Sequence, residues 1–259
     1  MRTLGAVPRL AAMPLAPARR YRVTDPVSVS ALALLAASAC ATGGVTTAAG
    51  PEGPAQAAYA PKSGRGPIVI VLSGQSGPGL YHGYAAELAG VGYYAVLLDG
   101  KDVLTGEQDG LANLRKAIER AQRAPQALAG KAAVVGFSLG GGGALTHAAR
   151  MPDLVAAVVA YYPVTRFVQD MASYAARFRV PILVLAGERD RYRDCCVIES
   201  MRAMEAAAGG RDTPFQLVVY PYAEHGFNLR TGAYRGDDDI DAWNRTREML
   251  RRYHPLPWC

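Results

Sequence analysis

The chain has few of the residues that metal centres need, and it lacks a long membrane-spanning run. It contains four cysteines and four histidines among 259 residues, and no C-x-x-C pair or Cys/His spacing indicates a metal site. The apolar run from Val27 to Ala39 is too short to cross a bilayer as a helix. The body also has no basic stripe with interleaved aromatic residues, which argues against nucleic-acid binding.

Most of the formal net charge of +6 lies at the N-terminus. Residues 1–40 hold five arginines and one aspartate, a net charge of +4 that leaves +2 for the rest. The basic cluster Arg19-Arg20-Tyr21-Arg22 precedes the apolar run, and small residues follow it. This order is typical of a signal peptide. We predict a signal peptide over residues 1–40, with translation starting at Met1 or Met13; a leader without an export role is the alternative.

Cys40 follows Ala37-Ser38-Ala39 and resembles the lipidated cysteine of bacterial lipoproteins, although Ala37 stands where that motif usually has leucine. We therefore expect an exported protein, periplasmic or attached to the cell envelope through a lipidated Cys40. Residues 41–66 are rich in Ala, Gly, Thr and Pro, which predicts a flexible tether before a domain at 67–259. Cys195, Cys196 and Cys259 favour buried structural thiols, and no disulfide can be deduced from their positions.

Apolar runs alternate with segments of helical periodicity throughout the body. The predicted strands are 68–72, 93–98, 132–135, 154–161, 182–185 and 215–220. The predicted helices are 81–89, 108–124, 140–150, 167–176, 197–208 and 240–253. The strands are continuous Val, Ile, Leu and Ala runs, as expected where helices cover both faces of a sheet. This alternation predicts an α/β fold with a doubly wound, mostly parallel sheet, whose sites form at the carboxyl ends of the strands.

The pentapeptide Gly136-Phe137-Ser138-Leu139-Gly140 lies where a strand, a sharp turn and a helix meet. This is the context of a nucleophile elbow, in which a serine on a strained turn projects its hydroxyl from the fold. Glycine tolerates the close backbone approach on either side. The following helix directs its free N–H groups and positive dipole end at the serine. A glycine-rich turn without chemistry is the alternative for this pattern alone.

Two further strand ends carry the partners that a serine nucleophile needs. Asp190 follows the strand 182–185, and His225 follows the strand 215–220, so the chain order is that of the α/β-hydrolases. An imidazole can take the serine proton because its ordinary pKa of about 6.5 is near neutral. The carboxylate holds the imidazole in the required tautomer. Glu188 is the rival acid, whereas none of the other histidines lies in a strand-end loop after the acid.

An oxyanion site is predicted from two backbone N–H groups, those of Leu139 and of Gln75 in the loop 73–77. Losing one such donor typically costs about 3 kcal/mol of transition-state stabilisation. The segment 162–181 is too short for a large cap domain, so we expect a shallow, open pocket that takes small acyl groups. Tyr81, Phe137 and Phe227 are predicted to line it, although the two phenylalanines fit core packing equally well.

Several segments together resemble the dienelactone hydrolase family of the α/β-hydrolase superfamily. They are residues 136–142, 185–190, 220–227 and 241–246. The resemblance spans about residues 67–253, and its more specific parts are His225-Gly226-Phe227 and the last helix. It implies hydrolysis of small esters or lactones through an acyl-enzyme, without a metal or an organic cofactor.

The chain departs from the founding enzymes of that family at two positions. They use a cysteine nucleophile where this chain has Ser138, and a glutamate in the loop that reads Ser73-Gly74-Gln75 here. We therefore predict a serine hydrolase for a small-molecule ester or lactone other than a dienelactone. The alternatives are an exported binding lipoprotein without catalysis, or an acyltransferase or peptidase with the same triad. No pattern predicts an oligomeric state.

Overall fold

The computed structural model describes residues 46–48 and 53–257. Within them, eight strands form one sheet in the order β1-β2-β4-β3-β5-β6-β7-β8. Strands β3 to β8 pair with one another in parallel, whereas β2 pairs antiparallel with the edge of β4 and β1 pairs antiparallel with β2. The strands are β1 (Thr46–Ala48), β2 (Gln56–Tyr59), β3 (Ile68–Leu72), β4 (Tyr94–Leu98), β5 (Ala132–Phe137), β6 (Val155–Tyr161), β7 (Ile182–Gly187) and β8 (Phe215–Tyr220).

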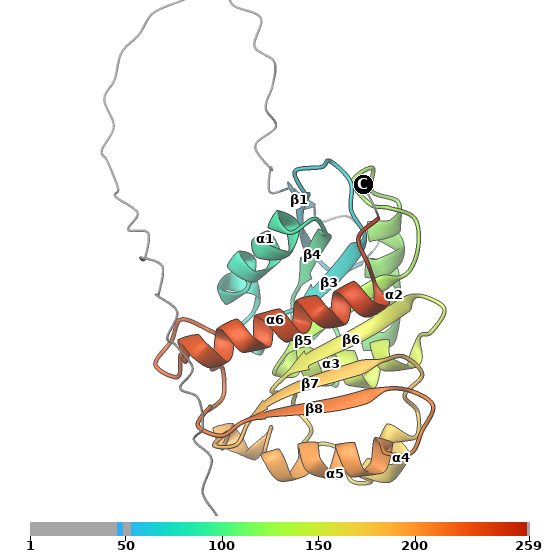
Figure 1. The fold of residues 1–259 in the computed structure, drawn as a ribbon. Coiled ribbons are helices and arrows are strands. Elements are labelled where there is room, and N and C mark those ends of the chain that lie inside the picture. The colour runs from blue at the N-terminus through green and yellow to red at the C-terminus, as the bar shows by residue number, and fades with distance from the viewer. Residues whose placement is uncertain (1–45, 49–52, 258–259) are drawn as a thin grey trace, which may run out of the picture. The chain divides into compact units, whose positions relative to one another are not determined.

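Helices cover both faces of this sheet. They are α1 (His82–Gly90), α2 (Gly110–Gln122), α3 (Leu139–Thr146), α4 (Met171–Ala175), α5 (Ile198–Ala208) and α6 (Gly236–Tyr253). Short 3-10 turns are η1 (Pro78–Leu80), η2 (Gly100–Asp102), η3 (Ala148–Arg150) and η4 (Tyr192–Asp194). Helices α1 and α6 pack on one face, and α2 to α5 pack on the other. Figure 1 shows α6 crossing in front of the central strands.

The continuous apolar strands are buried on both sides, as the sequence predicts. In β3, Ile68, Ile70 and Leu72 belong to the core under α2 to α5, whereas Val69 and Val71 face α1 and α6. All five side chains are fully buried. Successive side chains of a strand point to opposite faces, so a strand covered on both faces needs apolar residues at every position. The predicted doubly wound α/β fold is confirmed, in the form of an α/β-hydrolase-like sheet.

The predicted tether at residues 41–66 is wrong for the described part of that range. Strand β2 pairs with β4, and its alternate residues Ala57 and Tyr59 are buried against the face that carries α1. The hydroxyl of Tyr59 also hydrogen-bonds to Nδ1 of His82 in α1. The reason is the open edge of β4, whose backbone groups would otherwise lack partners. Composition alone does not reveal such an edge.

The boundaries of the predicted elements shift by a few residues, most clearly in α6. The helix begins at Gly236, four residues before the predicted start, and its first turn holds Asp237, Asp238 and Asp239. Carboxylates near a helix N-terminus are stabilised by the positive end of the helix dipole. The apolar periodicity used for the prediction misses this turn because its residues are polar.

The predicted signal peptide at 1–40, the candidate lipidation residue Cys40 and the terminal Cys259 lie outside the described residues. Among the described helices, none combines the length and the apolar character that spanning a bilayer requires. Export and envelope attachment therefore stay predictions from the sequence.

Two histidines, His254 and His147, should make the stability of the fold depend on pH. His254 lies at the end of the C-terminal helix, against the sheet. Its Nε2 donates to the carbonyl of Ile68 at 2.9 Å, and its ring stacks on Tyr93. Burial lowers the pKa of His254, and burial followed by the charge of Arg150 lowers the pKa of His147. Both histidines are thus held neutral by folding, so their contribution is present above about pH 6.5 and is lost as the pH falls.

We expect the free energy of unfolding, measured with urea at pH values from about 8 to about 5, to decrease below about pH 6.5. His254→Gln keeps a hydrogen-bond donor but removes the titration, so it should flatten part of that decrease. An equal decrease in both proteins would contradict this assignment.

Candidate active site

The sharp turn at Ser138 connects β5 to α3 and holds the serine in a strained conformation. Ser138 has φ 51° and ψ −111°, a positive-φ conformation that costs a non-glycine residue about 1–3 kcal/mol. Backbone hydrogen bonds hold it there: its N–H donates to the carbonyl of Tyr161 at 2.9 Å, and its carbonyl accepts from Gly142 and Val164. The surrounding fold therefore stabilises the strained turn predicted for a nucleophile elbow.

Two glycines flank Ser138 because the backbone approaches them too closely for a side chain. A Cβ at Gly136 would stand 2.3 Å from the carbonyl oxygen of Gly140. A Cβ at Gly140 would stand 2.4 Å from the carbonyl oxygen of Leu72. The N–H of Gly140 also donates to the carbonyl of Ser73 at 3.1 Å, which ties α3 to the loop after β3.

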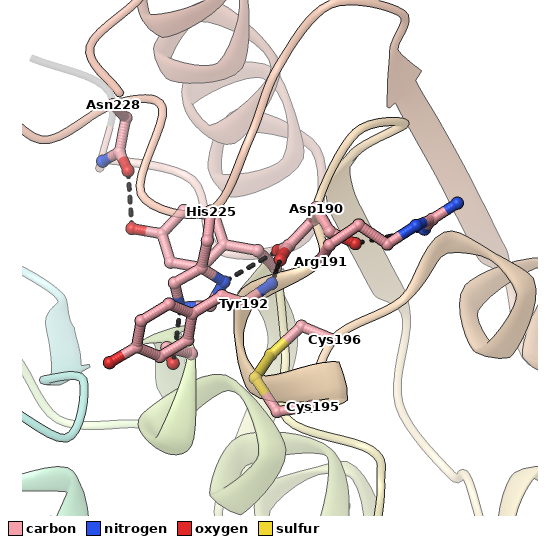
Figure 2. A network of polar contacts seen from close by, with 9 residues as sticks. Asp190, Arg191, Tyr192, Cys195, Cys196, His225 and Asn228 are labelled. Atoms are coloured by element: carbon pink, nitrogen blue, oxygen red, sulfur yellow. Dashed lines mark hydrogen bonds and ion pairs between the residues drawn. A yellow bond between two sulfur atoms is a disulfide. The ribbon is translucent and has the colours of Figure 1, made fainter. Parts of the chain in front are cut away.

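The three sequence-predicted residues Ser138, Asp190 and His225 come together at the carboxyl ends of β5, β7 and β8. Nε2 of His225 lies 2.9 Å from Oγ of Ser138, and Nδ1 of His225 lies 2.7 Å from Oδ2 of Asp190. Figure 2 shows the imidazole of His225 joined to Asp190 by a dashed line. Asp190 is fully buried and Ser138 nearly so. This chain of hydrogen bonds can move a proton away from the serine hydroxyl.

The structure shows which of the two candidate acids, Asp190 and Glu188, contacts His225. The second oxygen of Asp190, Oδ1, accepts the backbone N–H of Tyr192 at 3.0 Å, so both carboxylate oxygens are engaged. Glu188 instead forms an ion pair with Arg202 at 2.6 Å and stays partly exposed. Only Asp190 of the two touches His225.

Two tyrosines that the sequence analysis missed enclose the imidazole. The ring of Tyr192 stacks on His225 with centroids 4.6 Å apart, and Tyr162 meets it edge-on at 4.7 Å. The hydroxyl of Tyr162 donates to Oδ1 of Asn228 at 2.7 Å. Tyr162 directly follows strand β6, so the strand-end rule that found Asp190 and His225 could have found it as well. Tyr192 carries no such signal.

The predicted oxyanion donors, Leu139 and Gln75, both line the pocket that contains Ser138. Leu139 is the first residue of α3, so its N–H has no acceptor inside the helix. The loop that carries Gln75 packs closely against Tyr81, whose hydroxyl would stand 2.5 Å from a Cβ at Gly74. Both residues therefore lie in the same pocket as Ser138, and their role as oxyanion donors stays a prediction.

The predicted aromatic lining of the pocket is wrong. Tyr81, Phe137 and Phe227 are buried in the core on the α1 and α6 face, and burial raises the pKa of Tyr81 to about 12. Phe137 directly precedes Ser138, but its side chain lies in the core on the α1 and α6 face. There it packs against Tyr84 with ring centroids 4.8 Å apart. Apolar rings this close to the sheet are more stable in the core than at a solvent-facing rim.

The pocket itself has a volume of about 180 Å³, and its lining includes several cationic residues. Among the described residues that line it, three are cationic and none carries a carboxylate. The cationic residues are Lys101, Arg166 and Arg193; the others are Gln75, Thr105, Ser138, Leu139, Val164, Tyr192 and Cys195. The cationic side chains are exposed, so they can meet a ligand at the mouth of the pocket.

Cys195 and Cys196 are buried, as predicted, but they are not free thiols. They form a disulfide between adjacent residues, and Cys195 also lines the pocket. The backbone carbonyl of Cys195 accepts from the N–H groups of Thr165 and Arg166, which anchors this segment to the loop after β6. The pairing could not be deduced from the sequence, because the positions of cysteines alone do not determine their connectivity.

The family model described as "Dienelactone hydrolase family" matches residues 97–254, more than half of the chain. The chain belongs to this family. It is therefore a member of a hydrolase family, and the resemblance stated from the sequence is confirmed. The match contains all of Ser138, Asp190 and His225.

Individual relatives agree with this assignment. Over 126 residues the chain is 30% identical to the Escherichia coli (strain K12) protein named "Putative carboxymethylenebutenolidase", a match covering 46% of this chain and 45% of that protein. A similar protein from Yersinia pestis is 32% identical over 132 residues. The chain thus matches slightly less than half the length of these curated relatives.

Solved structures share the fold at low sequence identity. A "Putative Dienelactone Hydrolase" from Klebsiella pneumoniae superposes with a TM-score of 0.67 at 23% identity, covering 77% of this chain and 93% of that one. Est1E from Butyrivibrio proteoclasticus gives a TM-score of 0.61 at 17% identity, covering 82% and 99%. At such identities the likeness establishes the fold alone.

Proposed function

We propose that this protein is a serine hydrolase that cleaves small carboxylic esters or lactones through an acyl-enzyme. The observation that carries the proposal is the continuous hydrogen-bonded chain from Ser138 through His225 to Asp190. Ser138 Oγ attacks the carbonyl carbon while its proton passes to Nε2 of His225. The N–H groups of Leu139 and Gln75 donate hydrogen bonds to the carbonyl oxygen and stabilise the negative charge that develops on it.

Collapse of this tetrahedral intermediate breaks the bond to the leaving oxygen, which takes the proton from His225 and departs as an alcohol. In a lactone the same oxygen stays attached to the acyl group. A water molecule then attacks the acyl-enzyme and gives its proton to His225. The second collapse releases the carboxylic acid and returns the proton to Ser138. Asp190 holds the imidazole in one tautomer and stabilises its charged form during both steps.

The cationic lining favours a substrate that carries a negative charge beside the scissile bond. Lys101, Arg166 and Arg193 line a pocket of about 180 Å³, a volume that suits a small acyl group. A substrate carboxylate there would be attracted by all three side chains, and the attraction would weaken at high salt. We therefore propose a small ester or lactone with a free carboxylate as the preferred substrate class.

Labelling of the serine tests the proposed function directly. A fluorophosphonate probe should label the full-length chain at Ser138, as mapped by peptide mass spectrometry, because the probe reacts only with an activated hydroxyl. Ser138→Ala should abolish the label, whereas Ser63→Ala, which removes an exposed serine, should leave it unchanged. A folded protein that takes no label would favour a binding lipoprotein without catalysis. Two further assays distinguish the alternatives. Formation of a new ester in the presence of an added alcohol would indicate acyl transfer, and cleavage of an amide substrate would indicate peptidase activity.

Charge selectivity provides a second prediction. Arg166→Gln should raise KM for a monosuccinate ester about two- to fivefold, the range expected when one exposed ion pair is lost. The methyl ester of the same compound lacks the carboxylate, so its KM should not change. An equal increase for both esters would show that Arg166 shapes the pocket rather than recognising charge.

A further inference from the structure

The disulfide and the candidate base lie together in an arrangement that the proposed mechanism does not use. The sulfur atoms of Cys195 and Cys196 and an imidazole nitrogen of His225 all lie within 4.8 Å of one another. Both cysteines are at least 95% buried, with exposed fractions of 5% and 1%. Figure 2 shows the disulfide beside the Asp190–His225 pair.

Two thiolates and a neutral imidazole form a donor set typical of Zn²⁺ and Cd²⁺ sites. Hard cations such as Mg²⁺ prefer oxygen ligands and do not suit these donors. In the disulfide, however, each sulfur is bonded to the other and cannot act as a thiolate ligand. The donor set is complete only after reduction, and Cys195 lines the pocket, which offers an ion a path from solvent.

We propose that the reduced Cys195–Cys196 pair and His225 form a binding site for a thiophilic divalent cation. A dithiol reductant opens the site: its two hydrogens pass to the protein sulfurs while it becomes a disulfide itself. Binding then releases the two thiol protons to solvent, so that two thiolates and one neutral imidazole hold the ion.

The ion also blocks the hydrolase chemistry, a consequence that rests on the proposed function. Nε2 of His225 is hydrogen-bonded to Ser138, and Nδ1 is hydrogen-bonded to Asp190. Coordination of the ion by either nitrogen breaks one of these two bonds. Ser138 then loses its base or the imidazole loses its orienting carboxylate. The disulfide form is therefore unaffected by the ion, whereas the reduced form loses activity only while it holds the metal.

Cadmium titration of the full-length chain tests the site without reference to activity. The protein is reduced with a phosphine, which takes an oxygen atom from water and leaves two hydrogens on the sulfurs, and thiol counting by mass spectrometry verifies reduction. We expect a thiolate-to-cadmium absorption band and one added equivalent of bound Cd²⁺ only in the reduced protein. Mg²⁺ should produce no band.

Variants separate this site from the other cysteines. Cys195→Ser and Cys196→Ser should each abolish the added equivalent, whereas Cys40→Ser with Cys259→Ser should retain it. His225→Ala should weaken Cd²⁺ binding at least about tenfold, because losing even a hydrogen-bond partner of a metal ligand typically costs that much. Equal binding before and after reduction, or an unchanged affinity in His225→Ala, would overturn the proposal.

Inhibition supplies the second readout. Zn²⁺ should suppress ester hydrolysis by the reduced wild-type chain, and a chelator should restore it, whereas the disulfide form should keep its rate. Each cysteine variant is compared with its own rate without metal. If the chain hydrolyses no ester but the reduced form binds Cd²⁺ as described, the proposed function fails and the metal site stands. If Zn²⁺ inhibits both forms equally, the reduction-dependent site is wrong.

Discussion

Replacing Asp190 with asparagine should lower kcat/KM for a small ester by about 10⁴-fold. The buried carboxylate accepts the Nδ1–H of His225 at 2.7 Å and thereby leaves Nε2 free to accept the proton of Ser138. The amide of asparagine can instead donate to Nδ1, which places the imidazole proton on Nε2. That nitrogen then points a proton at the serine hydroxyl and cannot act as its base.

Glu188→Gln is the matched control for this experiment. Glu188 lies two residues earlier in the same loop, but its carboxylate pairs with Arg202 at the surface, where an ion pair contributes at most about 1 kcal/mol. We expect its kcat/KM to stay within about twofold of the wild-type value. Both variants should keep the melting temperature of the wild type within a few degrees. A large loss of activity in Glu188→Gln together with an active Asp190→Asn would refute the assignment of the acid.

Gly140→Ala should destabilise the fold by about 3 kcal/mol and reduce activity with it. The added Cβ would stand 2.4 Å from the carbonyl oxygen of Leu72 and 2.5 Å from that of Ser73. Both atoms belong to backbone in or next to the central strand β3, so neither can move aside as a flexible side chain could. Displacing α3 to relieve the clash would also stretch the hydrogen bond from Gly140 to Ser73.

Gly83→Ala is the matched control for the packing argument. Gly83 lies in the first turn of α1, is exposed, and a Cβ there would meet nothing within 4 Å. Alanine should therefore stabilise the protein by about 0.5–1 kcal/mol, because it favours a helix over glycine. Urea unfolding of both variants checks the pair. Equal stability of Gly140→Ala and the wild type would mean that the elbow accommodates a side chain.

The fold was predictable because its strands carry a simple signal. The parallel strands β3 to β7 are covered by helices on both faces, so nearly every position is apolar, and the β–α alternation is visible along the chain. The antiparallel strand β2 was not predictable in the same way. Its residues are ordinary for a linker, and they form a strand only because β4 offers an unpaired edge.

In the candidate site, too, one part was predictable from the sequence and another part was not. The sequence by itself determined where Ser138, Asp190 and His225 lie along the chain, because parallel strands bring their carboxyl ends to one edge of the sheet. Only the tertiary structure decided which side chains surround them: the buried aromatic residues, the tyrosines beside His225, the cationic pocket and the bonded Cys195–Cys196 pair. Positions along a strand follow from local periodicity, whereas contacts between loops depend on how distant segments pack, which no local pattern encodes.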